Sequence, residues 1–113
     1  MALTFTKLFQ PQQLPAAVTT IYTMPLLPVT SALKNGRVRL TNTTLGAVSA
    51  TLYAVPSAGT AGITNMFLSG TSISPNGYLD IDIPDLAYGD SLQGFASAAA
   101  SLTIHELGGV LYS

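Results

Sequence analysis

The sequence predicts an all-β fold, a single-domain antiparallel β-sandwich of about 7–8 strands that is either immunoglobulin-like or a jelly roll. Three observations predict it. Apolar and polar residues alternate with a period of two along most of the chain, and turn-forming residues separate the alternating segments. The only run that resembles a helix, residues 96–100, is too short to form one alone. A chain of 113 residues holds one domain, which we expect at residues 18–113, preceded by an N-terminal arm at residues 1–17.

The clearest alternation lies in residues 78–83, where Leu79, Ile81 and Ile83 are separated by polar residues. Similar patterns recur before and after this segment. Such alternation is typical of strands with one buried face. Residues 3–9 are a candidate for an additional strand. The strands are expected at residues 18–23, 32–42, 47–55, 66–73, 78–84, 90–97 and 101–112.

Turn-forming residues lie where strands are expected to end. Asn35-Gly36 and Asn76-Gly77 are strong turn signals, because asparagine and glycine both tolerate a positive φ. Residues 42–46 predict a hairpin loop that joins the strands on either side. Pro56 ends the third strand, because it cannot donate a hydrogen bond to the ladder. Residues 57–65 are rich in glycine, alanine and threonine and predict a long loop.

Composition excludes several classes of function. Only 8% of the residues are charged, against about 25% in an average domain, and the formal net charge is −1 without a basic run, so nucleic-acid binding is not expected. The absence of cysteine excludes disulfides and thiolate chemistry and fits a reducing cytosol. No apolar window reaches the 18 residues typical of a transmembrane helix, and a signal peptide is not expected. The charges number about one per 650 Å² of expected surface, which indicates a chain that covers part of its surface with other chains.

The residues that could carry chemistry are few. Asp80 and Asp82 lie on one strand face, about 6.5–7 Å apart. This spacing suits a bound cation or the two carboxylates of a glycosidase. Because no third acidic residue accompanies them, we favour a strand face that is simply exposed to solvent. His105 is the only histidine and has no nucleophile motif to serve, so a structural role is expected. Asn42-Thr43-Thr44 matches a glycosylation sequon by chance. We therefore expect no enzyme activity, no metal and no cofactor.

One apolar segment is a candidate interface. The segment is residues 24–29. Pro25 and Pro28 hold it extended, so it forms a loop or a sheet edge that would expose large side chains. It either folds back over one end of the sandwich or contacts a neighbouring subunit, and the contact is favoured. The candidate interface residues in it are Met24, Leu26, Leu27 and Val29.

The charged residues are segregated along the chain. The four basic residues precede position 40 and the five acidic residues follow position 79. They either pair across adjacent strands within one chain or fix the register between subunits of a closed ring. Those taken as interface candidates are Lys34, Arg37, Arg39, Asp80 and Asp82.

The chain resembles small β-rich structural proteins of tailed bacteriophages in motifs spread over most of its length. These are Ile21-Tyr22-Thr23 with Pro25, residues 36–43 and 48–57, Gly59-Thr60-Ala61-Gly62, residues 89–94, and residues 101–104 with Gly109. The sequence departs from the resemblance at residues 24–29, where similar proteins carry a polar loop.

The resemblance implies a virion protein that is assembled in the host cytoplasm. The first hypothesis is a capsid decoration, or cement, protein that binds the major capsid protein or another virion protein as a homo-oligomer, the expected state being a trimer. The alternative is a tail, baseplate or fibre component that presents loops to the host surface. Neither role involves nucleic acid or a membrane.

Overall fold

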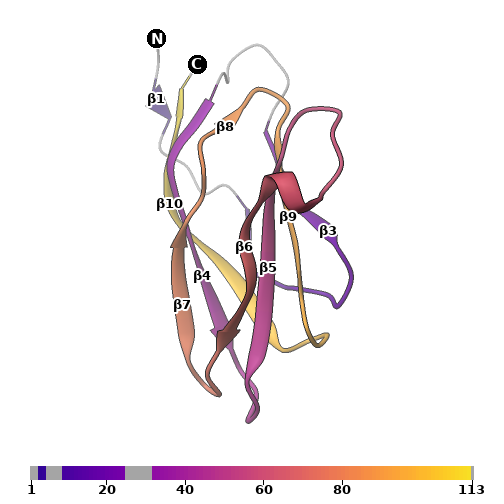
Figure 1. Cartoon of the computed structure of the whole chain (residues 1–113). Helices are drawn as coiled ribbons and strands as arrows, with labels where there is room; N and C mark the ends of the chain where they lie inside the picture. The colour runs from indigo at the N-terminus through magenta and orange to yellow at the C-terminus, as the bar shows by residue number, and fades with distance from the viewer. Residues whose placement is uncertain (1–2, 5–8, 25–31, 113) are drawn as a thin grey trace.

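The computed structural model describes residues 3–4, 9–24 and 32–112, which form two antiparallel sheets packed face to face (Figure 1). The all-β sandwich prediction is therefore confirmed. Within the described residues, no helix is long and apolar enough to cross a membrane. The strands are β1 (Leu3–Thr4), β2 (Gln12–Gln13), β3 (Thr19–Thr23), β4 (Ala32–Asn42), β5 (Val48–Val55), β6 (Met66–Ile73), β7 (Tyr78–Asp82), β8 (Leu86–Ala87), β9 (Ser91–Ala96) and β10 (Leu102–Tyr112), and a 3₁₀ turn, η1 (Ile63–Asn65), precedes β6.

The strand order distinguishes the two predicted architectures. One sheet has the order β1-β10-β4-β7, with β2 also paired to β10 and β8 also paired to β4, and the other sheet has the order β3-β9-β5-β6. We count β1 with β2, and β7 with β8, as one interrupted strand each. The eight strands then run first–eighth–third–sixth in one sheet and second–seventh–fourth–fifth in the other. This is the order of a jelly roll, so the immunoglobulin-like alternative is wrong.

The core lies between the sheets, where the inward-facing positions of each strand meet. In β9, for example, alternate residues are buried, as the predicted period of two requires. Apolar burial of this kind is the main favourable contribution to folding. The apolar side chains with no exposed area are Met24, Val38, Leu40, Leu52, Leu92, Ala96, Leu102 and Ile104.

Gly94 allows a close approach in the middle of the smaller sheet. It lies opposite Leu52 in the β5–β9 ladder. A Cβ atom at Gly94 would lie 2.6 Å from Leu52 Cδ2 and 2.6 Å from the carbonyl oxygen of Thr51. No neighbouring backbone can move aside to admit it, so the packing of β5 against β9 requires glycine.

The seven strands expected between residues 18 and 112 agree with the structure to within two residues at each boundary, but two predicted turns are wrong. Of the candidate strand at residues 3–9 the structure has β1, while residues 5–8 lie outside the described residues, and β2 and β8 were not predicted. Asn35-Gly36 lies inside β4, at a register shift against β10, because pairing on both sides keeps the strand extended and the extra residue forms a bulge. Residues 42–46 do not form a hairpin loop. They cross from one sheet to the other, since β4 and β5 belong to different sheets.

The division into an arm at residues 1–17 and a sandwich at residues 18–113 stays a prediction. Two parts of that arm belong to the packed structure. Thr103 of β10 pairs with Gln13 of β2, and Leu14 is 1% exposed within the core. The Asn76-Gly77 turn is confirmed: Asn76 has a φ of 54°, in the left-handed region.

Candidate interaction surface

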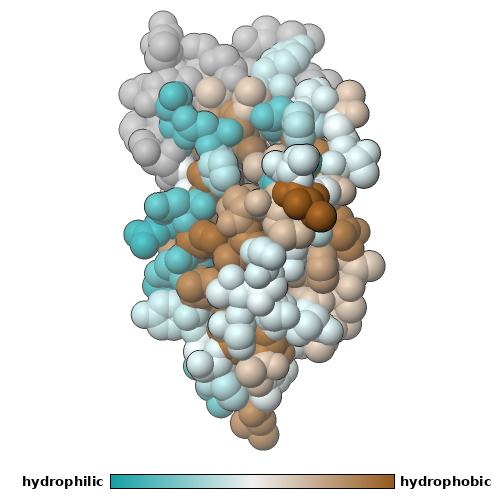
Figure 2. All heavy atoms as spheres, in the orientation of Figure 1, coloured by the Kyte–Doolittle hydropathy of each residue, from teal (hydrophilic) through white to brown (hydrophobic). Residues whose placement is uncertain are grey.

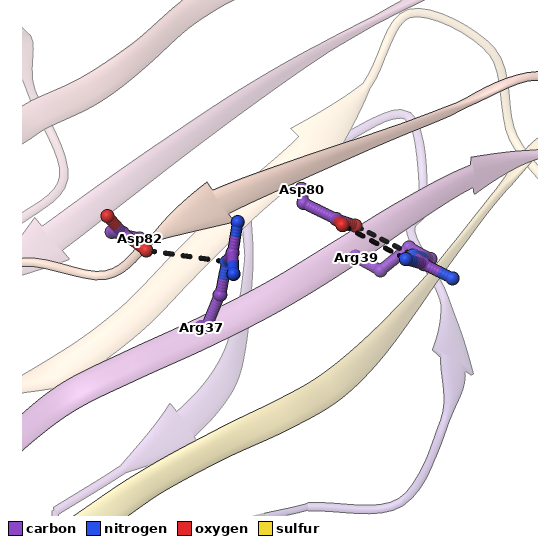
Figure 3. Close-up of polar contacts among 4 residues, drawn as sticks. All are labelled: Arg37, Arg39, Asp80 and Asp82. Carbon is purple, nitrogen blue, oxygen red and sulfur yellow. Dashed lines mark hydrogen bonds and ion pairs between the residues drawn. The ribbon is translucent and has the colours of Figure 1, made fainter.

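Adjacent strands place the charged candidates on one face. In the β4–β7 ladder Arg37 lies opposite Asp82 and Arg39 opposite Asp80. Because the four positions alternate with inward-facing residues, all four side chains project from the outer face of the larger sheet (Figure 3). Lys34, nearer the start of β4, reaches Asp85 just beyond β7. We call these three cross-strand pairs the charge ladder.

Ion pairs within the chain neutralise the charge ladder. Arg39 donates two hydrogen bonds to Asp80, from Nε to Oδ1 at 2.7 Å and from Nη2 to Oδ2 at 3.0 Å. Arg37 Nε lies 3.5 Å from Asp82 Oδ1, and Lys34 Nζ lies 3.4 Å from an Asp85 oxygen. Of the two arrangements predicted for the segregated charges, the structure shows pairing within one chain. A role of the same residues between subunits stays a prediction.

Arg39 and Asp80 form the pair with the shortest contact in the ladder. The guanidinium carbon of Arg39 lies 4.3 Å from the centre of the Tyr78 ring, a cation–π distance. The hydrogen bonds from Arg39 hold the pKa of the Asp80 carboxyl below its ordinary value, and the same contact raises the pKa of Arg39. Each group thus stabilises the charged form of the other.

Of the four apolar interface candidates, only Met24 lies among the described residues. Met24 has no exposed area and its backbone N–H donates to the carbonyl of Asp90 at 2.7 Å. Its side chain belongs to the core, so its assignment to an interface is wrong, because a side chain without exposed area offers no surface to a neighbouring chain. Leu26, Leu27 and Val29 lie outside the described residues, and their role stays a prediction.

The remaining polar candidates are not assembled into a catalytic or metal centre. Among the described residues, no group of three or more histidine, aspartate or glutamate side chains is placed to hold a metal ion, and no cavity or cleft is found. His105 lies opposite Arg39 in the β10–β4 ladder. The next residue, Glu106, has a buried Oε1 without a hydrogen-bond partner among the described residues.

Asn42 explains why the sequon is a chance match. Its side chain is fully buried, and its amide nitrogen donates to the carbonyls of Gly46 at 2.8 Å and Ile73 at 3.0 Å. Its Oδ1 accepts from the N–H of Thr44 at 2.9 Å and from the Thr44 hydroxyl at 2.7 Å. All four hydrogen-bonding positions of the amide are used, so the nitrogen is not open to modification in the folded chain.

Exposed apolar side chains occur at positions that the sequence analysis did not select. Leu45 and Ile63 are each 89% exposed, and Tyr78 is 61% exposed. The signal was present for Leu45, an aliphatic residue inside a turn otherwise built of threonine, asparagine and glycine. Figure 2 shows apolar surface between β7 and β6, but there Phe67, Leu79 and Ile81 are half-buried and pack against the core.

Comparison with known proteins supports the fold. No protein-family model and no curated protein matches the sequence. Among solved structures, 98% of this chain superposes on 32% of VP2 from the infectious bursal disease virus subviral particle, with a TM-score of 0.53 and 15% identity. The Gt strain of that virus gives a TM-score of 0.52 with 12% identity, over 97% of this chain and 32% of the other. This chain thus spans about a third of the VP2 chain and shares the fold of that part.

Proposed function

We propose that this chain is a non-enzymatic structural protein of a virus particle, and specifically a capsid decoration protein that binds the capsid surface as an oligomer and stabilises it. The observation that carries the proposal is the superposition of nearly the whole chain on part of VP2, a protein that forms a subviral particle. Jelly rolls recur in viral capsid domains, and the motifs that resemble tailed-phage proteins direct the proposal to a phage.

The surface chemistry supports a lattice-bound protein. Three of the four basic residues are neutralised within the charge ladder, which leaves few charges to desolvate when the chain is covered by neighbours. Many copies of a modest contact, repeated over a closed shell, give strong attachment through effective concentration rather than through one tight site. A homo-oligomer, expected to be a trimer, multiplies the contacts that each unit makes.

Copy number in purified particles tests the proposal. Densitometry of the stained protein bands, with peptide mass spectrometry to identify them, is expected to give on the order of hundreds of copies, as for a component that covers a lattice. A few copies to a few dozen would instead support a tail, baseplate or fibre component. Absence of the chain from the particles would overturn the virion role altogether.

Sedimentation velocity tests the oligomer. Purified protein at micromolar concentration is expected to sediment as a trimer of 11.7 kDa chains. A single species of monomer mass in solution, together with no trimer on the particle surface, would contradict the oligomeric part of the proposal and leave the virion role to the copy-number measurement.

A further inference from the structure

One end of the sandwich is built entirely from uncharged loops. Besides residues 14–18 between β2 and β3, three connections meet there: residues 43–47 between β4 and β5, residues 74–77 between β6 and β7, and residues 97–101 between β9 and β10 (Figure 1). None of them contains a lysine, arginine, histidine, aspartate or glutamate. We call these three loops the tip. The charge ladder lies on the outer face of the larger sheet, and its nearest pair, Arg39–Asp80, adjoins the tip at Tyr78.

Backbone hydrogen bonds join the three loops of the tip into one unit. The N–H of Thr43 donates to the carbonyl of Ser101 at 3.2 Å, which links the first loop to the third. The N–H of Asn76 donates to the carbonyl of Thr44 at 3.2 Å, which links the second loop to the first. Beneath them the buried Asn42 amide holds Thr44 and Gly46 from one side and Ile73 from the other. The loops are therefore fixed before any partner arrives.

Leu45 projects from this fixed unit. It lies between Thr44 and Gly46, the two residues that Asn42 holds, and 89% of it is exposed. In Figure 2 the surface at the lower end of the molecule, over the β4–β5 loop, is apolar. A large apolar side chain on a rigid loop, surrounded by small uncharged residues, has the features of an interface anchor: it loses little conformational entropy on binding and no charge is desolvated around it.

We propose that the tip is the surface by which this chain docks on its particle, with Leu45 inserted into an apolar recess on a different protein of the shell. This inference rests on the proposed virion function. The structure favours a different protein over a second copy, because the part of the chain that the structure describes has no cavity or cleft to receive the side chain. A lipid surface is disfavoured, since the tip offers one large aliphatic residue and no basic residue to attract anionic headgroups.

Rebinding to particles stripped of this chain tests the proposal. Wild-type protein and the variant Leu45→Asp are titrated against the stripped particles, and the bound fraction is measured by co-sedimentation. The matched control is Ile63→Asp, which makes the same change at an equally exposed residue of η1. Leu45→Asp is expected to weaken binding at least tenfold, or about 1.4 kcal/mol, whereas Ile63→Asp binds as the wild type does. Leu45→Met, which keeps an aliphatic side chain of similar volume, is expected to retain binding.

Each other outcome overturns a defined part of the proposal. If wild-type protein does not rebind, the virion function and the docking inference fall together. Two results would exclude only the tip as the docking surface. In one, wild-type protein rebinds and Leu45→Asp binds with an affinity within twofold of it. In the other, Ile63→Asp loses as much affinity as Leu45→Asp. Circular dichroism of all variants checks the fold. Loss of the oligomer in Leu45→Asp by sedimentation would make a second copy the occupant. Leu45-dependent binding to vesicles of phosphatidylserine and phosphatidylcholine would make it a lipid.

Discussion

The charge ladder and the tip share strand β4 yet are held in different ways. In the ladder, exposed side chains pair with one another: the side chain of Arg37 is 56% exposed and that of Asp82 is 87% exposed. Next to the tip, the buried Asn42 amide uses all four of its hydrogen-bonding positions, three on backbone groups and one on the Thr44 hydroxyl. Exposed ion pairs contribute little to stability because water competes for both charges, whereas a buried amide that loses its partners is costly. The ladder therefore keeps charged side chains in contact with water, whereas the Asn42 amide holds a loop of the tip in place.

The substitution Asn42→Ala is expected to have the largest effect, because it attacks the tip at its buried support. The carbonyls of Gly46 and Ile73 and the N–H of Thr44 would lose their partners. We expect a loss of about 3 kcal/mol in the free energy of unfolding, measured by urea denaturation. The control Asn65→Ala removes a similar but only half-buried amide, which bonds Thr60 and Gly62, and is expected to cost about 1 kcal/mol. Equal losses would show that the burial of Asn42 has no special weight.

Thr44→Val removes one hydrogen bond of the tip without changing its shape. The hydroxyl that donates to Asn42 Oδ1 is lost, while the N–H of Thr44 still donates to the same oxygen. We expect a loss of about 1 kcal/mol in unfolding free energy and faster amide exchange confined to the residues around Leu45. Exchange that rises evenly over the whole sandwich would contradict the view that the tip is a separately held unit.

Acid is expected to weaken the ladder before it affects the tip. Because Arg39 lowers the pKa of Asp80 in the folded chain, the carboxylate contributes stability that is fully present above its unfolded value of about 4 and is lost as the pH falls through the lower folded value. Asp80→Asn should therefore reduce the fall in the urea midpoint below about pH 4. The tip, which has no ionisable residue, should not contribute to that fall. An unchanged pH profile in Asp80→Asn would argue against this coupling.

Arg37→Gln is expected to have the smallest effect. Its nitrogen lies 3.5 Å from Asp82 and both side chains are mostly exposed. We expect no measurable change in the urea midpoint, whereas Arg39→Gln, which loses two hydrogen bonds and the contact with Tyr78, should lower it. If neither variant lowers the urea midpoint, the ladder does not stabilise the fold; if both lower it equally, the Arg39–Asp80 pair has no special weight.

The sequence predicted the strands well because each strand has one buried face, and that leaves a local signature of alternation. It could not predict which strands pair. The hairpin expected at residues 42–46 follows from a local rule, but β4 pairs with β10, β7 and β8, which are distant in the chain. In the same way, Asn35-Gly36 has the residues of a turn, and pairing on both sides of β4 turns it into a bulge.

The candidate site was predicted in part. The segregation of charges along the sequence predicted the residues of the ladder, because opposite charges that face each other on adjacent strands stabilise the pairing of those strands. Met24 was misplaced, because an apolar segment bracketed by prolines does not reveal which of its residues faces the core. Leu45 was missed because its significance depends on the Asn42 network, and Ile73 and Asn76 reach that network only in the folded chain.

The position of β10 has a consequence for how the chain is made. This strand lies between β4 and the pair β1 and β2, in the interior of its sheet, although it follows every other strand in the sequence. During synthesis, the larger sheet cannot close until residues 102–112 have left the ribosome, and until then the edge of β4 that pairs with β10 is open. Such an edge can pair with another nascent chain. Closure of the larger sheet is therefore expected to be slow, because it joins segments that are far apart in the sequence.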